Sequence, residues 1–200
     1  ARHGIPFHVL DRPDLLGGID VEGPILRPGF ESFVGHLPIP LRYGLTPGEL
    51  ARWWNSRLER AALLSVWQCR AYRRGTPFER LGVPWVKLSP SMCTTTTARF
   101  YPGTCLYEGT NLSEGRGSEA PFQILGAPWV DPAPWIEALA PLLPEDVRVT
   151  PVSFRPTFSK FQGEECRGIR LDTDSPVLHD AFGIGIRTLS AFMRSHPGRI

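Results

Sequence analysis

The chain has little of what marks several broad classes of protein. Its 200 residues include only four cysteines, none of which forms a Cys-x-x-Cys or Cys-x-His pair, so no zinc-site pattern is present. The formal charge is only +2 and no block of Lys and Arg stands out, which gives a nucleic-acid-binding function little support. No apolar run approaches the ~20 residues that a membrane-spanning helix needs.

Metal and phosphate patterns are also missing. The histidines lack metal-ligand spacing, and Gly103 and Gly109 do not form a phosphate-binding loop, so no metal site is predicted. Small buried thiols are the favoured interpretation of the cysteines, although a disulfide stays open because sequence does not give distances. The cysteines are Cys69, Cys93, Cys105 and Cys166.

Proline and glycine, in contrast, are abundant. The 21 prolines and 20 glycines are spread along the whole length, and six Trp and eleven Phe accompany them. This composition is typical of a folded, loop-rich protein rather than a disordered one.

Helix and strand patterns alternate along the chain, which indicates an α/β architecture. The clearest helix begins at Thr46, with Pro47 in the first helical position and Glu49 completing a capping box. Another helix is expected from Asp131, and a third over residues 176–195 with Ile186 on its buried side. Strands are predicted at residues 7–10, 63–69, 106–108, 147–154 and 168–171.

Asp131 also marks the predicted boundary between two domains. Residues 1–130 are expected to contain part of a parallel sheet, and residues 131–200 a separate, smaller α+β segment. The sequence shows no internal repeat.

The polar, glycine-rich segment 108–118 is the first candidate for chemistry. If residues 106–108 form a strand, Glu108 ends it, and Glu114 and Arg116 follow in the loop where α/β proteins bind ligands. Two neighbouring carboxylates are suited to acid–base work on a glycosidic bond. The alternative is structural: Glu114 and Arg116 form an ion pair within the loop, and Asn111 caps a turn.

Three further groups follow other elements. Asp11 and Arg12 come directly after the first strand, and an Asp beside an Arg is most often a local ion pair. Arg42 is suited to bind a carboxylate or a sugar hydroxyl, although a surface arginine is the simpler interpretation. The threonine run at residues 94–97 predicts a strand edge or a turn.

Several stretches of sequence resemble one family closely. They include HVLDRPDLLGG from residue 8, SFVGHLPIPLRYGLTPGELARWWN from residue 32, and FRPTFSKFQGEECRGI from residue 154. The longest is FYPGTCLYEGTNLSEGRGSEAPFQILGAPWV, over residues 100–130. These stretches are similar to the NamZ-type exo-β-N-acetylmuramidases, and the chain is identified as matching the middle part of that family.

The resemblance implies a fold and an activity. It implies a partial Rossmann-like parallel sheet in residues 1–130, followed by a smaller α/β domain, with a cleft between the two. The implied reaction is the release of N-acetylmuramic acid from the non-reducing ends of peptidoglycan fragments. No cofactor is implied, and the family's chains are about twice as long as this one.

The resemblance also implies which residues line the cleft. The proposed catalytic Glu of the family belongs to a first half that this chain does not match, which leaves Glu108 and Glu114 as the local catalytic candidates. The residues expected to bind the saccharide are Asp11, Arg12, Arg42, Asn111, Glu114 and Arg116.

Departures from the family pattern leave an alternative open. Tyr43 stands where the family usually has His, and Ser91 where it has Asn, so a non-catalytic sugar-binding remnant is the competing interpretation. The expected partners are a peptidoglycan-derived saccharide and either a separate N-terminal half or a second copy of the chain. The compartment also stays open: secreted or periplasmic if an export signal lies upstream, otherwise cytoplasmic.

Overall fold

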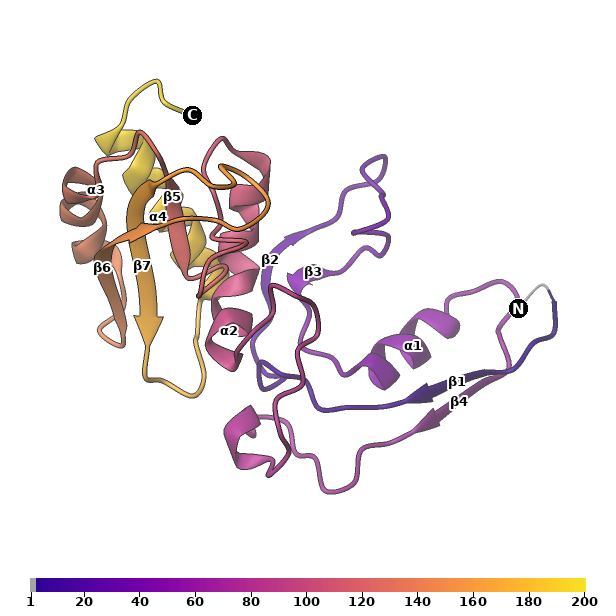
Figure 1. Ribbon diagram of the computed structural model, residues 1–200. Helices are drawn as coiled ribbons and strands as arrows, with labels where there is room; N and C mark the ends of the chain where they lie inside the picture. The colour runs from indigo at the N-terminus through magenta and orange to yellow at the C-terminus, as the bar shows by residue number, and fades with distance from the viewer. Residues whose placement is uncertain (1–2) are drawn as a thin grey trace. The chain divides into compact units, whose positions relative to one another are not determined.

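The computed structural model describes residues 3–200, which divide into two compact units (Figure 1). Unit 1 contains the residues up to Val21 together with Ile25–Val83, and unit 2 contains Glu22–Pro24 and Pro84–Ile200. The mixture of parallel strands, antiparallel strands and helices confirms the predicted α/β class.

The units divide near residue 83, whereas the sequence analysis placed a domain boundary at Asp131. The reason lies in strand pairing. The strand β5 (Ile124–Ala127) precedes Asp131 and pairs with β7 (Cys166–Thr173), which follows it. A division at residue 130 would separate these two hydrogen-bonded strands.

Unit 1 is built on two short parallel strands. β1 (Phe7–Leu10) pairs with β4 (Leu64–Trp67), with Val9 opposite Val66, and both strands were predicted. The helix α1 (Pro47–Asn55) packs against both strands. The remaining short elements are β2 (Glu22–Ile25), which crosses the division between the units, β3 (Pro40–Arg42) and the 3₁₀ turn η1 (Phe78–Arg80).

The start of α1 confirms the predicted capping box. The Glu49 amide donates to the Thr46 hydroxyl at 3.1 Å, and the Glu49 carboxylate accepts from the Thr46 amide at 2.9 Å. These two bonds satisfy donors that the first turn of a helix leaves unpaired. The cap therefore fixes where the chain after β3 turns into α1.

Unit 2 is a three-stranded antiparallel sheet covered by helices. β7 lies between β5 and β6 (Val147–Phe154). The helices α2 (Thr95–Thr104), α3 (Pro132–Leu139) and α4 (Ala181–Ser195) pack together and against the strands, and two 3₁₀ turns complete the unit, η2 (Cys105–Gly109) and η3 (Ala140–Leu142).

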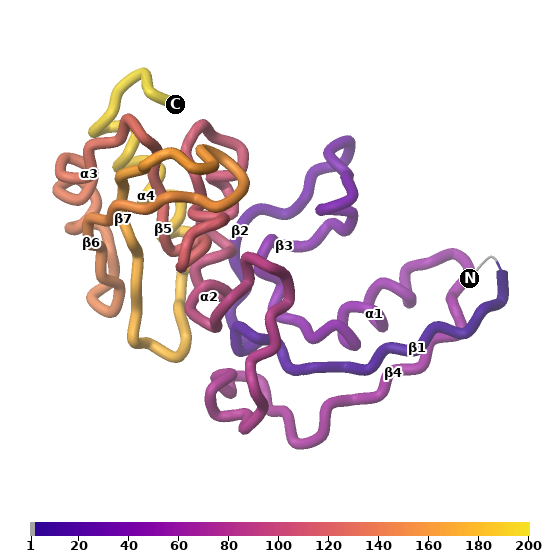
Figure 2. The backbone as a smooth tube through the Cα atoms, viewed as in Figure 1, coloured from indigo at the N-terminus to yellow at the C-terminus, as the bar shows by residue number. Residues whose placement is uncertain are grey.

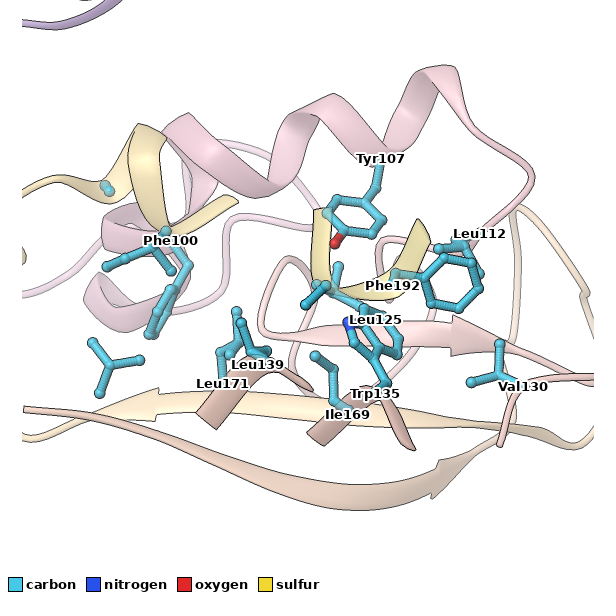
Figure 3. Close-up of a cluster of buried hydrophobic side chains, with 14 of the residues drawn as sticks. Phe100, Tyr107, Leu112, Leu125, Val130, Trp135, Leu139, Ile169, Leu171 and Phe192 are labelled. Atoms are coloured by element: carbon cyan, nitrogen blue, oxygen red, sulfur yellow. The ribbon is translucent and has the colours of Figure 1, made fainter. Parts of the chain in front are cut away.

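A continuous apolar core holds unit 2 together (Figure 3). Trp135 and Phe192 are fully buried and meet edge to face, with ring centroids 4.8 Å apart. The Trp135 indole nitrogen donates to the Thr188 carbonyl at 3.0 Å, so its burial leaves no polar atom unpaired. This core fixes the elements from which the 108–118 segment projects.

Two predicted elements differ in the structure. Residues 106–108 were predicted as a strand but lie in the 3₁₀ turn η2, where the Tyr107 and Glu108 carbonyls bond to a lysine rather than to a neighbouring strand. The threonine run at 94–97 was predicted as a strand edge or turn, but Thr94 caps α2, accepting from the Thr97 amide at 3.0 Å. The helix contains Pro102, so the sequence pattern alone argues against it.

The last helix is shorter than predicted, and one position expected on its buried side is exposed. α4 begins at Ala181 rather than near residue 176. Ile186, which was expected on the buried side, is 43% exposed, whereas Gly185 and Thr188 face inward. A Cβ on Gly185 would lie 2.3 Å from the backbone of Gly103 in α2, so the close approach of two glycines sets this face.

Candidate functional site

The 108–118 segment brings three of the predicted site residues together. The Arg116 guanidinium pairs with Glu108 at 2.5 Å and with Glu114 at 3.1 Å. One guanidinium thus bridges two carboxylates, as its fork of donors allows. This is the ion pair that the structural alternative anticipated, and it includes Glu108 as well.

Glu114 and Glu108 differ in their surroundings. Glu114 is 2% exposed, and its Oε2 atom has no hydrogen-bond partner, although the ammonium of Lys160 lies 3.6 Å away. Glu108 remains partly exposed at the end of the same network. The buried Glu114 side chain therefore ties the loop to Arg116 and Lys160, whereas Glu108 is accessible to a ligand.

Aromatic rings surround the same guanidinium. Arg116 lies over the Phe122 ring at 4.9 Å, and Tyr101 meets Phe122 edge to face at 4.8 Å. Burial raises the pKa of Tyr101, and the nearby Cys105 and Glu108 raise it further while Arg116 lowers it. Tyr101 is therefore part of this cluster, although sequence analysis missed it because it precedes the glycine-rich segment on α2.

Lys160 is the second residue that sequence analysis missed. It lies in the loop 155–165 between β6 and β7, far along the chain from the residues it contacts. The backbone trace in Figure 2 shows this loop returning toward the 105–118 segment. Only the tertiary fold reveals the contact, since a single lysine in a loop carries no motif.

Asn111 belongs to the 108–118 segment but contacts a different part of the chain. Its amide nitrogen donates to the Arg199 carbonyl at 2.6 Å, near the end of the chain. Arg199 in turn lies over the Trp129 ring at 5.8 Å. Asn111 thus anchors the C-terminal segment in this structure, rather than joining the Arg116 network.

Asp11, Arg12 and Arg42 belong to unit 1, whereas the residues described so far belong to unit 2. The Asp11 carboxylate accepts from the Gly48 amide at 2.7 Å and from the Thr46 hydroxyl at 2.9 Å. An anion at the start of α1 is stabilised by the free amides there. Arg12 is exposed beside it.

The closeness of Asp11 to α1 depends on a glycine. A Cβ on Gly48 would lie 2.6 Å from the Asp11 carboxyl carbon and 2.5 Å from Val66. Any larger residue would push the helix away from the strand ends.

Arg42 is buried rather than open to a ligand. Its guanidinium pairs with Asp20 at 3.0 Å and donates to the Leu16 carbonyl at 2.8 Å. The side chain is 4% exposed, so the simpler expectation of a surface arginine is wrong. In this structure Arg42 holds the loop after β1 in place.

Unit 1 also contains a polar cluster that the sequence did not single out. Burial raises the pKa of Asp14, with smaller opposing effects from its bond to the Leu16 amide and from three arginines. Burial also raises the pKa values of Tyr43 and Tyr72, and the Asp14 charge raises both further. A half-buried carboxylate near two phenols at the end of a parallel strand fits the usual position of an α/β binding site.

The four cysteines are free thiols, and Cys166 is buried while the others are half-buried. Burial raises the pKa of Cys105 to about 11, and the Glu108 charge adds to the effect. Within the described part of the chain, every helix is too short or too polar to span a bilayer.

Two family models match the chain almost from end to end. The model described as exo-β-N-acetylmuramidase NamZ, N-terminal, covers residues 1–96, and the corresponding C-terminal model covers residues 99–200. The peptidoglycan β-N-acetylmuramidase NamZ of Bacillus subtilis (strain 168) is 41% identical over 195 residues, which is 98% of this chain and 47% of that protein.

Two solved structures are also similar. Both are crystal structures of DUF1343 family proteins from Bacteroides fragilis NCTC 9343. One has a TM-score of 0.91 at 29% identity and the other 0.70 at 27%, covering 100% and 99% of this chain. Each match covers 53% of the solved chain, so this chain spans about half the length of the relatives that it matches.

Proposed function

Because this chain belongs to the exo-β-N-acetylmuramidase NamZ family, a family of peptidoglycan glycoside hydrolases, we propose that it takes part in the same chemistry. The reaction is the release of N-acetylmuramic acid from the non-reducing ends of peptidoglycan fragments. In this proposal the chain supplies groups that bind the saccharide, and Arg116 is the principal one.

The surroundings of Arg116 carry this proposal. N-acetylmuramic acid differs from N-acetylglucosamine by a lactyl group, whose carboxylate calls for a cation. Arg116 keeps 31% of its side chain exposed while Phe122 supports one face of the guanidinium. A held but accessible guanidinium is suited to bind that carboxylate, and Tyr101 offers a ring beside it.

The same network argues against Glu114 as the proton donor. The group that protonates the leaving oxygen must reach the substrate, whereas Glu114 is 2% exposed and is held between Arg116 and Lys160. We therefore assign Glu114 to holding the loop and Glu108 to ligand contact. The acid that protonates the leaving group belongs, in this proposal, to another part of the enzyme.

A binding measurement tests the role of Arg116. The chain is titrated with N-acetylmuramic acid and with N-acetylglucosamine, and ring resonances of Tyr101 are followed by NMR. We expect Arg116→Ala to weaken binding of the muramic acid roughly tenfold or more, since losing a charge-assisted hydrogen bond costs ~1.5–3 kcal/mol. Binding of the glucosamine should change far less.

Arg170→Ala is the matched control for that measurement. Arg170 has a similar exposure, 35%, and also pairs with two carboxylates, Glu119 and Asp172, but it lies on β7. The control should bind as the unaltered chain does. Equal affinities of Arg116→Ala and Arg170→Ala would refute the proposed role.

A non-catalytic saccharide-binding protein is the second candidate. The observation in its favour is that Arg116 holds both carboxylates of the 108–118 segment. A chromogenic N-acetylmuramide assay on the 200-residue chain separates the two candidates. Hydrolysis by this chain, alone or after a separately produced N-terminal half is added, would eliminate the non-catalytic candidate, whereas saccharide binding without hydrolysis in both mixtures would support it.

We also propose that further polypeptide covers an apolar face of unit 1. Leu10 and Trp67 are paired on one face of the β1–β4 sheet and are both more than half exposed, as is Phe7 on the opposite face, although parallel sheets are normally covered on both faces. Because the relatives are about twice as long, we favour an additional α/β segment of the NamZ type as the covering partner.

Light scattering with size-exclusion chromatography tests that partner. The chain should run as a monomer that binds a separately produced N-terminal half, and Leu10→Glu should abolish the complex. A concentration-dependent dimer that Leu10→Glu dissociates would instead indicate a second copy of the chain, and would overturn the preference for an additional segment.

A further inference from the structure

The contacts of Lys160 exceed what one ammonium group can satisfy by ordinary hydrogen bonds. Four backbone carbonyl oxygens surround its Nζ atom, from Tyr107 at 2.9 Å, Glu108 at 3.1 Å, Thr110 at 2.8 Å and Leu112 at 2.9 Å. An ammonium group has three N–H bonds, so at least one proton is shared. The Glu114 carboxylate adds a fifth oxygen at 3.6 Å.

This arrangement has the character of an ion site. A shell of carbonyl oxygens that takes the place of water around a monovalent cation is the device by which proteins hold potassium. Here the cation is attached to the protein by the lysine side chain. Lys suits the role because its charge is compact, whereas Arg carries a planar fork.

The backbone on both sides of Lys160 supports a specific placement. Ser159 has a φ of 75° and Phe161 a φ of 58°, so both flanking residues lie in the left-handed region without being glycine. Such conformations cost free energy and persist where surrounding contacts impose them. Thr157 adds an anchor, since its amide and hydroxyl both donate to the Gly117 carbonyl, at 2.9 and 3.0 Å.

We propose that Lys160 is a tethered monovalent cation that organises residues 105–114, and that it acts as a positioning residue for Glu108 and Arg116. The carbonyls that it gathers replace the strand pairing that the sequence of this segment suggested. Without a cation, four carbonyl dipoles would point at one another in a partly buried site. Residues 105–114 would therefore be expected to change conformation when the cation is removed.

Replacement of the tethered cation by a free one tests the proposal. In Lys160→Ala the carbonyl shell remains but the ammonium is gone, so ammonium or potassium ions should fill it. At equal ionic strength of about 100 mM, we expect ammonium and potassium chloride to raise the Tm of Lys160→Ala by roughly 3 °C over choline chloride. The unaltered chain should show no such difference.

Two control variants separate this role from a simple ion pair. Lys160→Met keeps the side chain up to the Cε position and removes the charge, so it should be destabilised and insensitive to the choice of cation. Lys87→Ala removes the other lysine of the chain, which is exposed, and should behave as the unaltered protein does.

Three results would overturn the proposal. They are equal Tm values of Lys160→Ala in all salts, the same gain in the unaltered chain, and a Lys160→Ala chain that stays unfolded even in ammonium chloride. The first and third would show that a free cation cannot take the place of the lysine, and the second that the gain in Tm does not depend on removal of the lysine.

The consequence for saccharide binding rests on the proposed function and has its own measurement. Lys160→Ala should bind N-acetylmuramic acid about tenfold more weakly in choline chloride, and ammonium chloride should restore most of the affinity. A cation-dependent Tm without any change in saccharide binding would refute the link to function while leaving the cation site intact.

Discussion

The two units of this chain hold their polar residues in different ways. In unit 2 the network of Glu108, Glu114 and Arg116 projects from a closed apolar core around Trp135. In unit 1 comparable groups are held mainly by backbone amides, carbonyls and ion pairs, beside a two-stranded sheet whose apolar side chains are largely exposed. Unit 2 has the features of a complete folding unit, whereas unit 1 has those of part of a larger sheet.

Arg74 illustrates how unit 1 is held together. Its guanidinium donates to the Gly18 and Gly44 carbonyls and pairs with Glu49 at 2.6 Å, so one exposed side chain ties two loops to the start of α1. Exposed ion pairs contribute little to stability individually. Unit 1 therefore depends on networks of weak contacts where unit 2 depends on burial.

The largest predicted effect contrasts one tryptophan from each unit. Trp135→Ala should lower the free energy of unfolding by about 3–5 kcal/mol, because it opens a cavity in the core of unit 2 and removes the bond to Thr188. Trp67→Ala, at a side chain that is 64% exposed, should change it by less than about 0.5 kcal/mol. Urea unfolding followed by circular dichroism measures both; equal losses would contradict the contrast.

The next effect concerns the cap of α1 in unit 1. Thr46→Ala removes the hydroxyl that accepts from Glu49 and donates to Asp11, and should cost about 1 kcal/mol. Ser56→Ala is the control at the other end of the same helix, where the hydroxyl only donates to the Trp53 carbonyl. Amide exchange in α1 should accelerate in the first variant only.

A third prediction uses aspartates whose pKa values shift in opposite directions. Burial raises the pKa of Asp14 in unit 1 above its ordinary 3.8, so its favourable contribution exists at low pH and is lost as the pH rises through the folded-state value. The hydrogen bond from Arg148 lowers the pKa of Asp174 in unit 2, so its contribution exists above 3.8 and is lost as the pH falls.

Substitution of each aspartate by asparagine distinguishes the two cases. Asp14→Asn should gain stability over the unaltered chain as the pH rises from 4 toward neutrality, at ~1.4 kcal/mol for each unit of pKa shift at most. Asp174→Asn should instead lose stability relative to the unaltered chain as the pH rises toward 3.8 from below, and the difference should then stay level at higher pH. The free energy of unfolding, measured across the pH series, gives the sign of each change. A lower stability of Asp14→Asn than of the unaltered chain at neutral pH would contradict the proposed effect of burial on Asp14.

The smallest effect is on thiol reactivity in unit 2. Since burial raises the pKa of Cys105 to about 11, only about one thiol in a thousand is ionised at pH 8, and alkylation should be slow. The rate should rise about tenfold for each pH unit, and Glu108→Gln should accelerate it by removing a nearby charge. Mass spectrometry of iodoacetamide-treated protein gives the rate; no change in Glu108→Gln would place Glu108 outside the cluster.

Local signals in the sequence determined much of this structure. Thr46, Pro47 and Glu49 determined the start of α1, because a capping box is satisfied within four consecutive residues. The α/β class followed from alternating patterns, and the family resemblance followed from long specific stretches, which the comparisons confirm. That the residues of the 108–118 segment share a cleft with Asp11, Arg12 and Arg42 stays a prediction.

Only the tertiary structure decided the environment of the site. The 106–108 segment has the composition of a strand, but its carbonyls turn toward Lys160, which comes from a loop about 50 residues later. Likewise, the burial of Glu114 and Arg42 depends on neighbours distant in sequence. Caps and periodicities are encoded by neighbouring residues, whereas burial and ion pairing are set by which distant segments the fold brings together.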